Sequence, residues 1–449
     1  MRDGVIQNGV IRIVVAAVLL TLAGASTAAS QGQPVLRLSL TEARARALDA
    51  SHRLAETRAR ESVARAVVDA RQAAERPVVT GIAGYTRTNH VLEFVVPSPT
   101  GAPRVLYPDV PDNYRTRLDV QWPIYTGGRG DALIRAAQAE AGAVAAEAAV
   151  ARADLRLEVS RAFWAVVTAR STVSVLEQAL ARAEGNVGDA RARLAAGLVP
   201  PNEVASAEAQ AARQRMFLVE ARNLQETTAA DLGRLVGAGP DEVVEAQAVL
   251  EDGSDPIPAR DALLAEARAQ RAERRAIEGR VDVARELRLA AQAAQRPQIS
   301  LGGGVDYARP NPRIFPRARV WDDSWDAGVT VSWSLWDGGR AAAEAAQATQ
   351  QGEASRQRLL DFDAMLAVDV RQRSLEIASG EAAIAAADEA IRAATEARRV
   401  VGERYHAGVI AQSEVLDADV ALLQVQLDRT RALAGVRLAE ARLERALGR

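Results

Sequence analysis

An extended motif occurs twice in this chain, and the duplication limits the possible folds more than any other feature of the sequence. Residues 122–129 (WPIYTGGR) correspond to residues 333–340 (WSLWDGGR), at a displacement of 333 − 122 = 211. Residues 193–199 (RLAAGLV) correspond to residues 404–410 (RYHAGVI) at the same displacement, 404 − 193 = 211. Two pairs of motifs at one displacement indicate an internal duplication, so both halves should fold to the same plan.

The first copy of the motif ends a strand-like stretch. Apolar and polar residues alternate from 115 to 125, which predicts a strand with one apolar and one polar face. The second copy ends a similar stretch, whose apolar positions are Val329, Val331, Trp333 and Leu335. Each half has another predicted strand before this one, over residues 78–86 in the first half and 298–307 in the second. The proline-rich segment between the first two strands predicts neither helix nor strand.

A long alanine-rich run follows each Gly-Gly-Arg. Residues 129–196 contain no proline and predict a single long helix. Its apolar residues recur at spacings of three and four from Val159 to Leu194, a period that predicts a left-handed coiled coil. The corresponding seam of the second half, in a helix over residues 340–407, is interrupted by Arg398.

The remaining segments complete the plan. Helices are predicted over residues 41–76 and 261–296, and return helices run over residues 202–236 and from Gly408 to the C-terminus. These boundaries divide the chain into four parts. They are a signal peptide (1–30), a first repeat (31–236), a turn-rich connecting equatorial segment with one short helix (237–260) and a second repeat (261–449).

The first 30 residues are typical of a secretory signal. Arg2 and Arg12 provide the positive end, residues 13–25 form the apolar core, and residues 25–30 (ASTAAS) offer small side chains for cleavage. The apolar run is too short to cross a bilayer as a helix, and no comparable run follows it. We therefore expect an exported protein without a membrane-spanning helix.

Composition excludes several classes of protein. The chain has no cysteine, so disulfides, thiolate metal sites and cysteine nucleophiles are excluded. It has no lysine, which excludes a Walker-type phosphate loop, and its net charge of −2 does not indicate a nucleic-acid partner. His52, His90 and His406 fall in three different predicted elements and do not form a metal motif. We expect no enzymatic activity, metal site or cofactor.

The predicted strands have the length and amphipathic character of strands in outer-membrane barrels. Trp122, Tyr125, Trp333 and Trp336 lie at strand ends, where aromatic residues meet the membrane interface. The alternative is a pair of soluble hairpins that pack an ordinary core. In lipid, four strands cannot close a barrel and an open edge is not tolerated, so several chains would have to share one barrel.

The duplicated strand, Gly-Gly-Arg turn and long helix resemble the TolC-like outer-membrane efflux proteins, and the resemblance covers essentially the whole mature chain. It implies a homotrimer with a mixed α+β fold, in which four strands per chain build a 12-stranded β-barrel continued by an α-helical coiled-coil barrel in the periplasm. It also implies an exit duct for a tripartite efflux pump or a type I secretion system. Outer-membrane lipid, a periplasmic adaptor and an inner-membrane transporter would be its partners.

The resemblance also implies roles for particular residues. Glu414 and Asp417 match the acidic pair at the narrow periplasmic opening of the channel, and their spacing places both carboxylates on one helix face. The alternative is that both are solvated surface acids. The first repeat has Glu203 but Ser206 at the equivalent positions. The positions that match the adaptor-docking hairpin tips are Arg193, Gly197, Leu198, Val199, Arg404, Gly408, Val409 and Ile410.

The leading hypothesis is therefore a passive outer-membrane duct. The alternative function is an exported structural coiled-coil protein without channel activity. These hypotheses differ in whether the protein inserts into a membrane and conducts ions. The cargo stays open among drugs, metal ions and unfolded polypeptides.

Overall fold

The computed structural model describes residues 35–449 except 240–241, 252 and 254–255, so the predicted signal segment lies outside the described residues. The chain forms two compact units. The first, called here the helical unit, contains Ala162–Leu250, Ala394–Thr430 and the segment that ends at Ala50. The second, called the sheet unit, contains Ser51–Arg161, Glu251–Ala393 and Arg431–Arg449.

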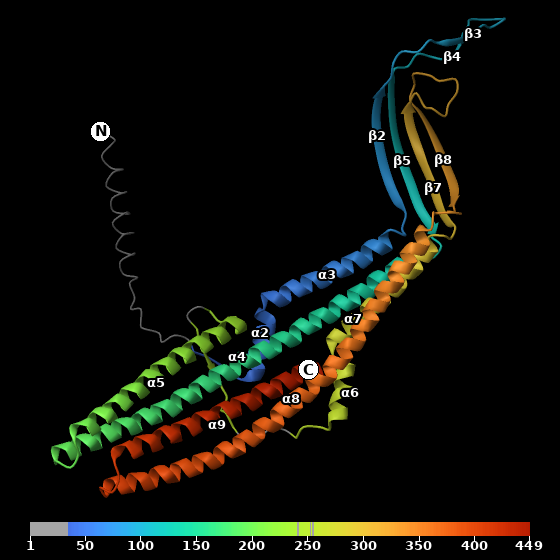
Figure 1. The fold of residues 1–449 in the computed structure, drawn as a ribbon. Helices are drawn as coiled ribbons and strands as arrows, with labels where there is room; N and C mark the ends of the chain where they lie inside the picture. The colour runs from blue at the N-terminus through green and yellow to red at the C-terminus, as the bar shows by residue number, and fades with distance from the viewer. Residues whose placement is uncertain (1–34, 240–241, 252, 254–255) are drawn as a thin grey trace, which may run out of the picture. The chain divides into compact units, whose positions relative to one another are not determined.

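Four long helices follow the duplicated pattern closely. Helix α4 (Arg129–Ala195) and helix α8 (Arg340–His406) each have 67 residues, and α5 (Pro201–Val236) and α9 (Gln412–Leu447) each have 36. Each helix of the second pair begins 211 residues after its counterpart (340 − 129 and 412 − 201). Within the helical unit, α4 with α5 and α8 with α9 form two hairpins that lie side by side (Figure 1).

The shorter helices are each broken once, where the sequence predicted continuous helices. The breaks separate α2 (Leu40–Ala50) from α3 (His52–Ala73), and α6 (Arg260–Gln270) from α7 (Ala272–Ala293). Ser51 and Arg271 have extended backbone, and the Ser51 hydroxyl caps α3 by accepting a hydrogen bond from Leu54 N. At the first break the apolar spacing continues from Ala47 to Leu54, so periodicity does not reveal it. At the second break no proline marks the five-residue step from Ala267 to Ala272.

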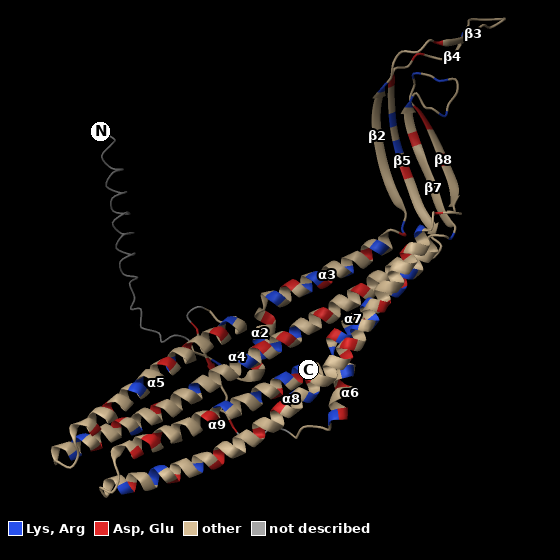
Figure 2. Ribbon diagram, viewed as in Figure 1, with Lys and Arg blue, Asp and Glu red and all other residues tan. Residues whose placement is uncertain are grey.

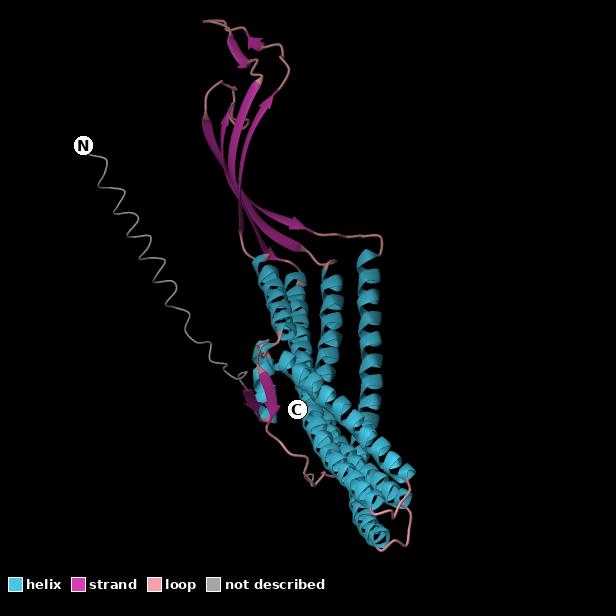
Figure 3. Cartoon of the chain, turned by 90° about the vertical axis from the view of Figure 1, so that its left-hand side faces the viewer, coloured by secondary structure: helices cyan, strands magenta, loops and turns pink. Residues whose placement is uncertain are grey.

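The main sheet is antiparallel and has four strands in the order β2-β5-β7-β8. The strands are β2 (Val78–Arg87), β5 (Asp112–Tyr125), β7 (Gln298–Arg309) and β8 (Asp322–Ser332). All four lie in the sheet unit and twist together (Figure 3). Because β2 and β8 are the two edges, each has one side that pairs with no strand in the described part of the chain.

Three local predictions of secondary structure were wrong. The proline-rich segment contains a small hairpin of β3 (Phe94–Val96) and β4 (Arg104–Tyr107). Strand β8 ends at Ser332, so Trp333 and Leu335 lie beyond it. The described part of the connecting segment contains a strand, β6 (Val243–Ala246), instead of a short helix, and β6 pairs in parallel with β1 (Val35–Leu38). That pairing joins residues far apart in sequence, so local pattern cannot predict it.

The core of the helical unit is the predicted coiled-coil seam. Every seam residue of this unit, from Ala162 to Leu194, is buried or half-buried, and so is the first seam residue, Val159, which belongs to the sheet unit. Leucine and alanine from three helices meet there, as expected when small and large side chains alternate across close-packed helices. The central cluster consists of Val173, Leu176, Ala179, Leu218, Ala221 and Leu423. None of the helices in the described part of the chain combines the length and the apolar character of a membrane-spanning helix.

Candidate functional site

One face of the main sheet is apolar and open to solvent. The strand register places Leu118 beside Gly81 and Val305, so the apolar positions of all four strands share this face. Its side chains are exposed, and Val329 on the edge strand has 64% of its surface accessible. A continuous apolar face of this kind marks contact with a membrane or a partner. The main apolar residues of this face are Val79, Leu118, Val120, Leu301, Val305, Trp325, Val329 and Val331.

The opposite face of the sheet is charged. Arg117 on β5 donates hydrogen bonds to Asp119, to Asp306 on β7 and to Asp326 on β8, while Arg115 also pairs with Asp306. The Asp306 side chain is almost completely buried among these partners, and Figure 2 shows basic and acidic positions on β5 and an acidic position on β7. The network therefore joins three strands through charge-assisted hydrogen bonds.

A glycine makes room for this network. A Cβ atom at position 304 would lie 2.7 Å from Arg117 Nη2 and 2.6 Å from Leu118 O. Any side chain at this position would therefore displace the guanidinium that reaches across β7 to Asp326. The sequence shows that charged residues occupy alternate positions of β5, but it does not show which carboxylates the two arginines contact.

The predicted aromatic residues lie at the end of the sheet that adjoins the helices. The indole Nε1 of Trp122 donates to Glu75 O at 3.2 Å, and that of Trp333 donates to Gln295 O at 3.0 Å. Both acceptors lie just beyond the C-terminus of a short helix, so the two halves use the same contact. Both rings stay exposed, as do Tyr125 and Trp336.

A second aromatic group lies at the other end of the sheet, and no pattern in the sequence indicates it. Tyr114 lies 5.0 Å from Tyr85 and 5.9 Å from Trp321, measured between ring centroids. Trp321 stacks on Tyr307 at 5.0 Å with an interplanar angle of 18°. These rings come from three strands and one loop, so only the strand register brings them together.

The two helical hairpins end in matching turns. Gly197 and Gly408 have positive φ of 68° and 73°, and the following residues, Leu198 and Val409, donate backbone hydrogen bonds to Arg193 O and Arg404 O. This is the αL termination that glycine permits and other residues strain. A Cβ on either glycine would meet no atom within 4 Å, so the requirement for glycine within this chain is the backbone angle.

The predicted docking residues differ in their surroundings. Leu198 and Val409 are largely exposed, and Val199 and Ile410 are half-buried. Arg404 is exposed, whereas the Arg193 guanidinium lies 4.2 Å from the centroid of the Tyr405 ring and donates to His406 O. Arg193 therefore ties the end of α4 to the end of α8.

Tyr405 itself is almost fully buried, and burial raises the pKa of its phenol. This buried ring gives the Arg193 guanidinium a fixed surface against which to stack. The contact was not predicted, because α4 and α8 are not adjacent in sequence.

The two predicted acidic residues lie in the first turns of α9. Glu414 and Asp417 are both exposed, and neither carboxylate accepts a hydrogen bond from another side chain in the described residues. In the first hairpin, the equivalent Glu203 has one buried carboxylate oxygen without a hydrogen-bond partner in the described residues. The two hairpins are therefore not equivalent at this position.

A polar network lies deeper in the helical unit, where Arg398 interrupts the seam. The Asp419 carboxylate accepts hydrogen bonds from Arg398 Nε at 3.0 Å and from Asn186 Nδ2 at 2.7 Å. Arg182 Nε lies 3.8 Å from the same carboxylate. Burial lowers the pKa of Arg182, an effect that the charge of Asp419 opposes. Asp419 thus connects α4, α8 and α9, and the interruption at Arg398 was its only sequence signal.

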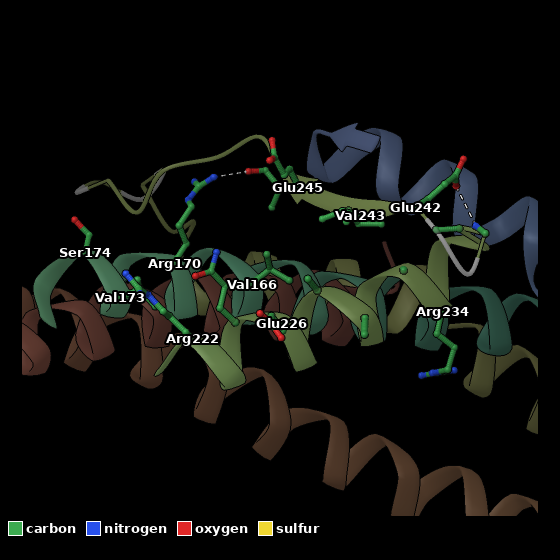
Figure 4. Close-up of a pocket in the computed structure, with 18 of the residues that line it drawn as sticks. Val166, Arg170, Val173, Ser174, Arg222, Glu226, Arg234, Glu242, Val243 and Glu245 are labelled. Atoms are coloured by element: carbon green, nitrogen blue, oxygen red, sulfur yellow. Dashed lines mark hydrogen bonds between the residues drawn. The ribbon is translucent and has the colours of Figure 1, made fainter. Parts of the chain in front are cut away.

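A cavity of about 1100 Å³ lies between α4, α5 and β6 in the helical unit (Figure 4). Arg170 borders it and donates a hydrogen bond to Ala246 O, which holds the connecting segment against α4. Arg222 and Glu177 form an exposed ion pair along its wall. Charged side chains of both signs are mixed, and no nucleophile is paired with a base among the described residues that line it, so the cavity lacks the arrangement that catalysis needs.

The three histidines belong to different elements. His52 begins α3, His406 ends α8, and His90 pairs with Asp109 in the loop before β5. Within the described residues, no group of three or more histidine, aspartate or glutamate side chains could hold a metal ion.

Comparison with solved structures shows a shared fold. A membrane protein from Pseudomonas aeruginosa is 22% identical, with a TM-score of 0.74 over 91% of this chain and 93% of that one. The outer membrane protein VceC from Vibrio cholerae is 21% identical, with a TM-score of 0.74 over 91% and 96% of the chains. The open-state MtrE outer membrane channel from Neisseria gonorrhoeae is 20% identical, with a TM-score of 0.76 over 91% and 88%.

No curated protein matches the chain. The outer membrane efflux protein family matches residues 43–238 and 263–449, which together include all four long helices and the main sheet. This match confirms the resemblance drawn from the duplicated motifs. The chain belongs to the outer membrane efflux protein family.

Proposed function

We propose that three copies of this chain form one duct that passes substrates from a periplasmic assembly to the exterior. As a member of its family, the chain is an outer-membrane efflux channel and not an enzyme. The trimer, the barrel and the partner proteins are the proposed part. In this arrangement, the sheets of three chains make a 12-stranded barrel, and the helical hairpins continue it in the periplasm.

The exposed apolar face of the sheet carries this proposal. A four-stranded sheet with an apolar face, a charged face and two unpaired edges cannot be stable alone in lipid, because free backbone groups there cost several kcal/mol each, roughly. Pairing β8 of one copy with β2 of the next would satisfy both edges. The apolar face would then meet lipid, and the Arg117 network would line the lumen.

The two aromatic groups support this orientation. Tyr114 and Trp122 are eight positions apart on β5 (122 − 114), which corresponds to about 27 Å along a strand. With a strand tilt of about 40°, the separation along the membrane normal is about 20 Å, close to the height of the apolar band in outer-membrane barrels. Each group would then lie at one membrane interface.

The exposed acids of α9 are proposed to surround the narrow periplasmic opening of the duct. Three copies of Glu414 and Asp417 around one axis would concentrate negative charge and favour cations. The tips at Gly197 and Gly408 would meet a periplasmic adaptor through Leu198 and Val409, since these two apolar side chains are largely exposed. An inner-membrane transporter would supply the energy. Its identity would determine whether the duct serves an efflux pump or a type I secretion system.

Single-channel recording in a planar bilayer tests the function. Purified wild-type protein should give discrete, cation-preferring steps, and Asp417→Asn should shift the reversal potential toward non-selectivity, because it removes one ring of charge. Glu177→Gln, on a helix surface of the same unit, is the matched control and should leave selectivity unchanged.

Equal reversal potentials for wild type and Asp417→Asn would contradict the assignment of the opening. A protein that stays soluble and never inserts would instead support an exported structural coiled coil.

A further inference from the structure

The loop between β7 and β8 is tied to the charged face of the sheet. We propose that this loop, residues 310–321, is a cap that narrows the outer mouth of the duct and is held down by Arg313 and Asn311. The inference rests on the proposed function, in which the charged face lines the lumen. It concerns the end of the sheet remote from the helices, where β7 ends at Arg309 and β8 begins at Asp322.

The first anchor is an ion pair with the sheet itself. Arg313 Nη2 donates to Asp326 Oδ1 at 2.7 Å, and Arg313 Nη1 donates to Trp325 O at 2.9 Å. Asp326 lies four residues into β8, about 13 Å from the start of the strand. It belongs to the charged face, because it also accepts hydrogen bonds from Arg117. The loop therefore turns back toward the lumen face and does not extend away from the sheet.

The second anchor is a buried amide whose hydrogen bonds are all made. The Asn311 side chain is almost completely buried; its Nδ2 donates to Asp322 O and Ser324 Oγ, both at 3.0 Å. Its Oδ1 accepts from Arg313 N at 2.9 Å and from Ser324 Oγ at 3.3 Å. A buried amide with two donors and two acceptors satisfied fixes the loop direction just after β7.

Contacts at the other end of the loop complete a bridge across the top of the sheet. Arg317 donates to Tyr107 Oη at 2.6 Å and to Asn113 Oδ1 at 3.4 Å, and Arg319 donates to Asp109 O at 2.5 Å. Arg317 and Arg319 thus tie this loop, which connects β7 to β8, to the segment that leads into β5. The other loop of the sheet, residues 88–111, instead forms the separate β3–β4 hairpin.

The Arg313–Asp326 pair is partly exposed, and Asp326 is shared with Arg117. Losing Arg313 therefore leaves Asp326 with a partner, so the sheet should persist while the middle of the loop loses its bond to the charged face. Three loops around the axis would obstruct the mouth together, so their release should widen the narrowest point at that end.

The first test compares the unitary conductance of Arg313→Ala with that of wild type in planar bilayers. We expect a gain in conductance for Arg313→Ala. Arg87→Ala is the matched control, because it removes an ion pair with Asp112 at the same end of the sheet but from the apolar face. The control should conduct as wild type does. Equal conductance of Arg313→Ala and wild type would overturn the cap.

The second test reads the loop position from thiol reactivity as well as from conductance. Because the chain has no cysteine, the pair Asn311→Cys and Ser324→Cys places the only two thiols where the side chains now touch. Oxidation should form a disulfide and keep conductance low, and reduction should raise it, since the Asn311 anchor is then absent. Two thiols that both label with maleimide after oxidation would contradict the anchored loop. If no variant conducts, the duct itself is wrong, and the thiol result still reports whether the loop is anchored.

Discussion

At the scale of single residues, the turns at the hairpin tips depend on backbone angles. Gly197 and Gly408 occupy the left-handed region, and a Cβ added to either would have no neighbour within 4 Å. The need for glycine here is conformational, and the proposed contact with an adaptor would be a separate requirement. The two can be separated by choosing side chains that tolerate or resist positive φ.

We predict that Gly408→Val disorders the tip and abolishes export, because a β-branched residue at positive φ is strained by about 1–2 kcal/mol or more. Gly408→Asn should keep the turn, since asparagine tolerates this region. Gly402→Ala, inside α8 with open space around it, is the control and should export normally. Substrate efflux and hydrogen exchange at the tip measure the outcome. Normal export by Gly408→Val would show that the positive φ at this position is not required for export.

At the scale of elements, Asp419 links helices of both hairpins through a half-buried network. Arg398 occupies a position where the seam calls for an apolar residue, and the equivalent residue of the first repeat is Val187 (398 − 211). A polar residue in a coiled-coil seam fixes register at a cost in stability. We therefore expect the network to set how α8 and α9 pack on α4.

We predict that Asp419→Leu destabilises the helical unit by about 1–3 kcal/mol, because it leaves Arg398 and Arg182 without their carboxylate. Arg398→Leu combined with Asp419→Leu should cost less than the sum of the single changes, since the seam becomes apolar. Hydrogen exchange of α8 and α9, measured for both single variants and the double variant, gives the coupling. Additive effects would show that the two residues act independently.

The long elements and the duplication could be predicted from sequence, because heptad spacing and the Gly-Gly turns are local properties of the chain. The helix breaks at Ser51 and Arg271 could not, since no proline marks either of them. The displacement between halves also changes, from 260 − 40 = 220 at the short helices to 211 at the long ones. The displacement changes because the loop between β2 and β5 is longer than the loop between β7 and β8. The duplicated motifs all lie after these loops, so they reveal only the displacement of 211.

The candidate sites show the same division. The exposure of Leu198, Val409, Glu414 and Asp417 agrees with their expected surface roles, which stay predictions. Arg193, by contrast, stacks on Tyr405, and this contact depends on two helices that meet only after folding. The Asp419 network, the second aromatic group and the anchored loop also depend on the tertiary arrangement, because their residues come from separate elements.

At the scale of the whole molecule, the two faces of the sheet should respond oppositely to charge. We predict that Val329→Arg lowers the yield of folded protein in the outer membrane, because a lipid-facing arginine costs up to about 2–4 kcal/mol. Thr330→Arg, the adjacent residue on the charged face, should assemble normally. Heat-modifiable migration of membrane extracts measures folded protein. Equal yields would show that the apolar face does not meet lipid.

The copy number of the assembly tests the central claim most directly. The claim requires several chains, because β2 and β8 leave two edges that one chain does not pair in its described part. Native mass spectrometry of the detergent-extracted protein should give three copies of the chain and no stable monomer. A stable folded monomer, or an assembly of any other number, would contradict the shared 12-stranded barrel.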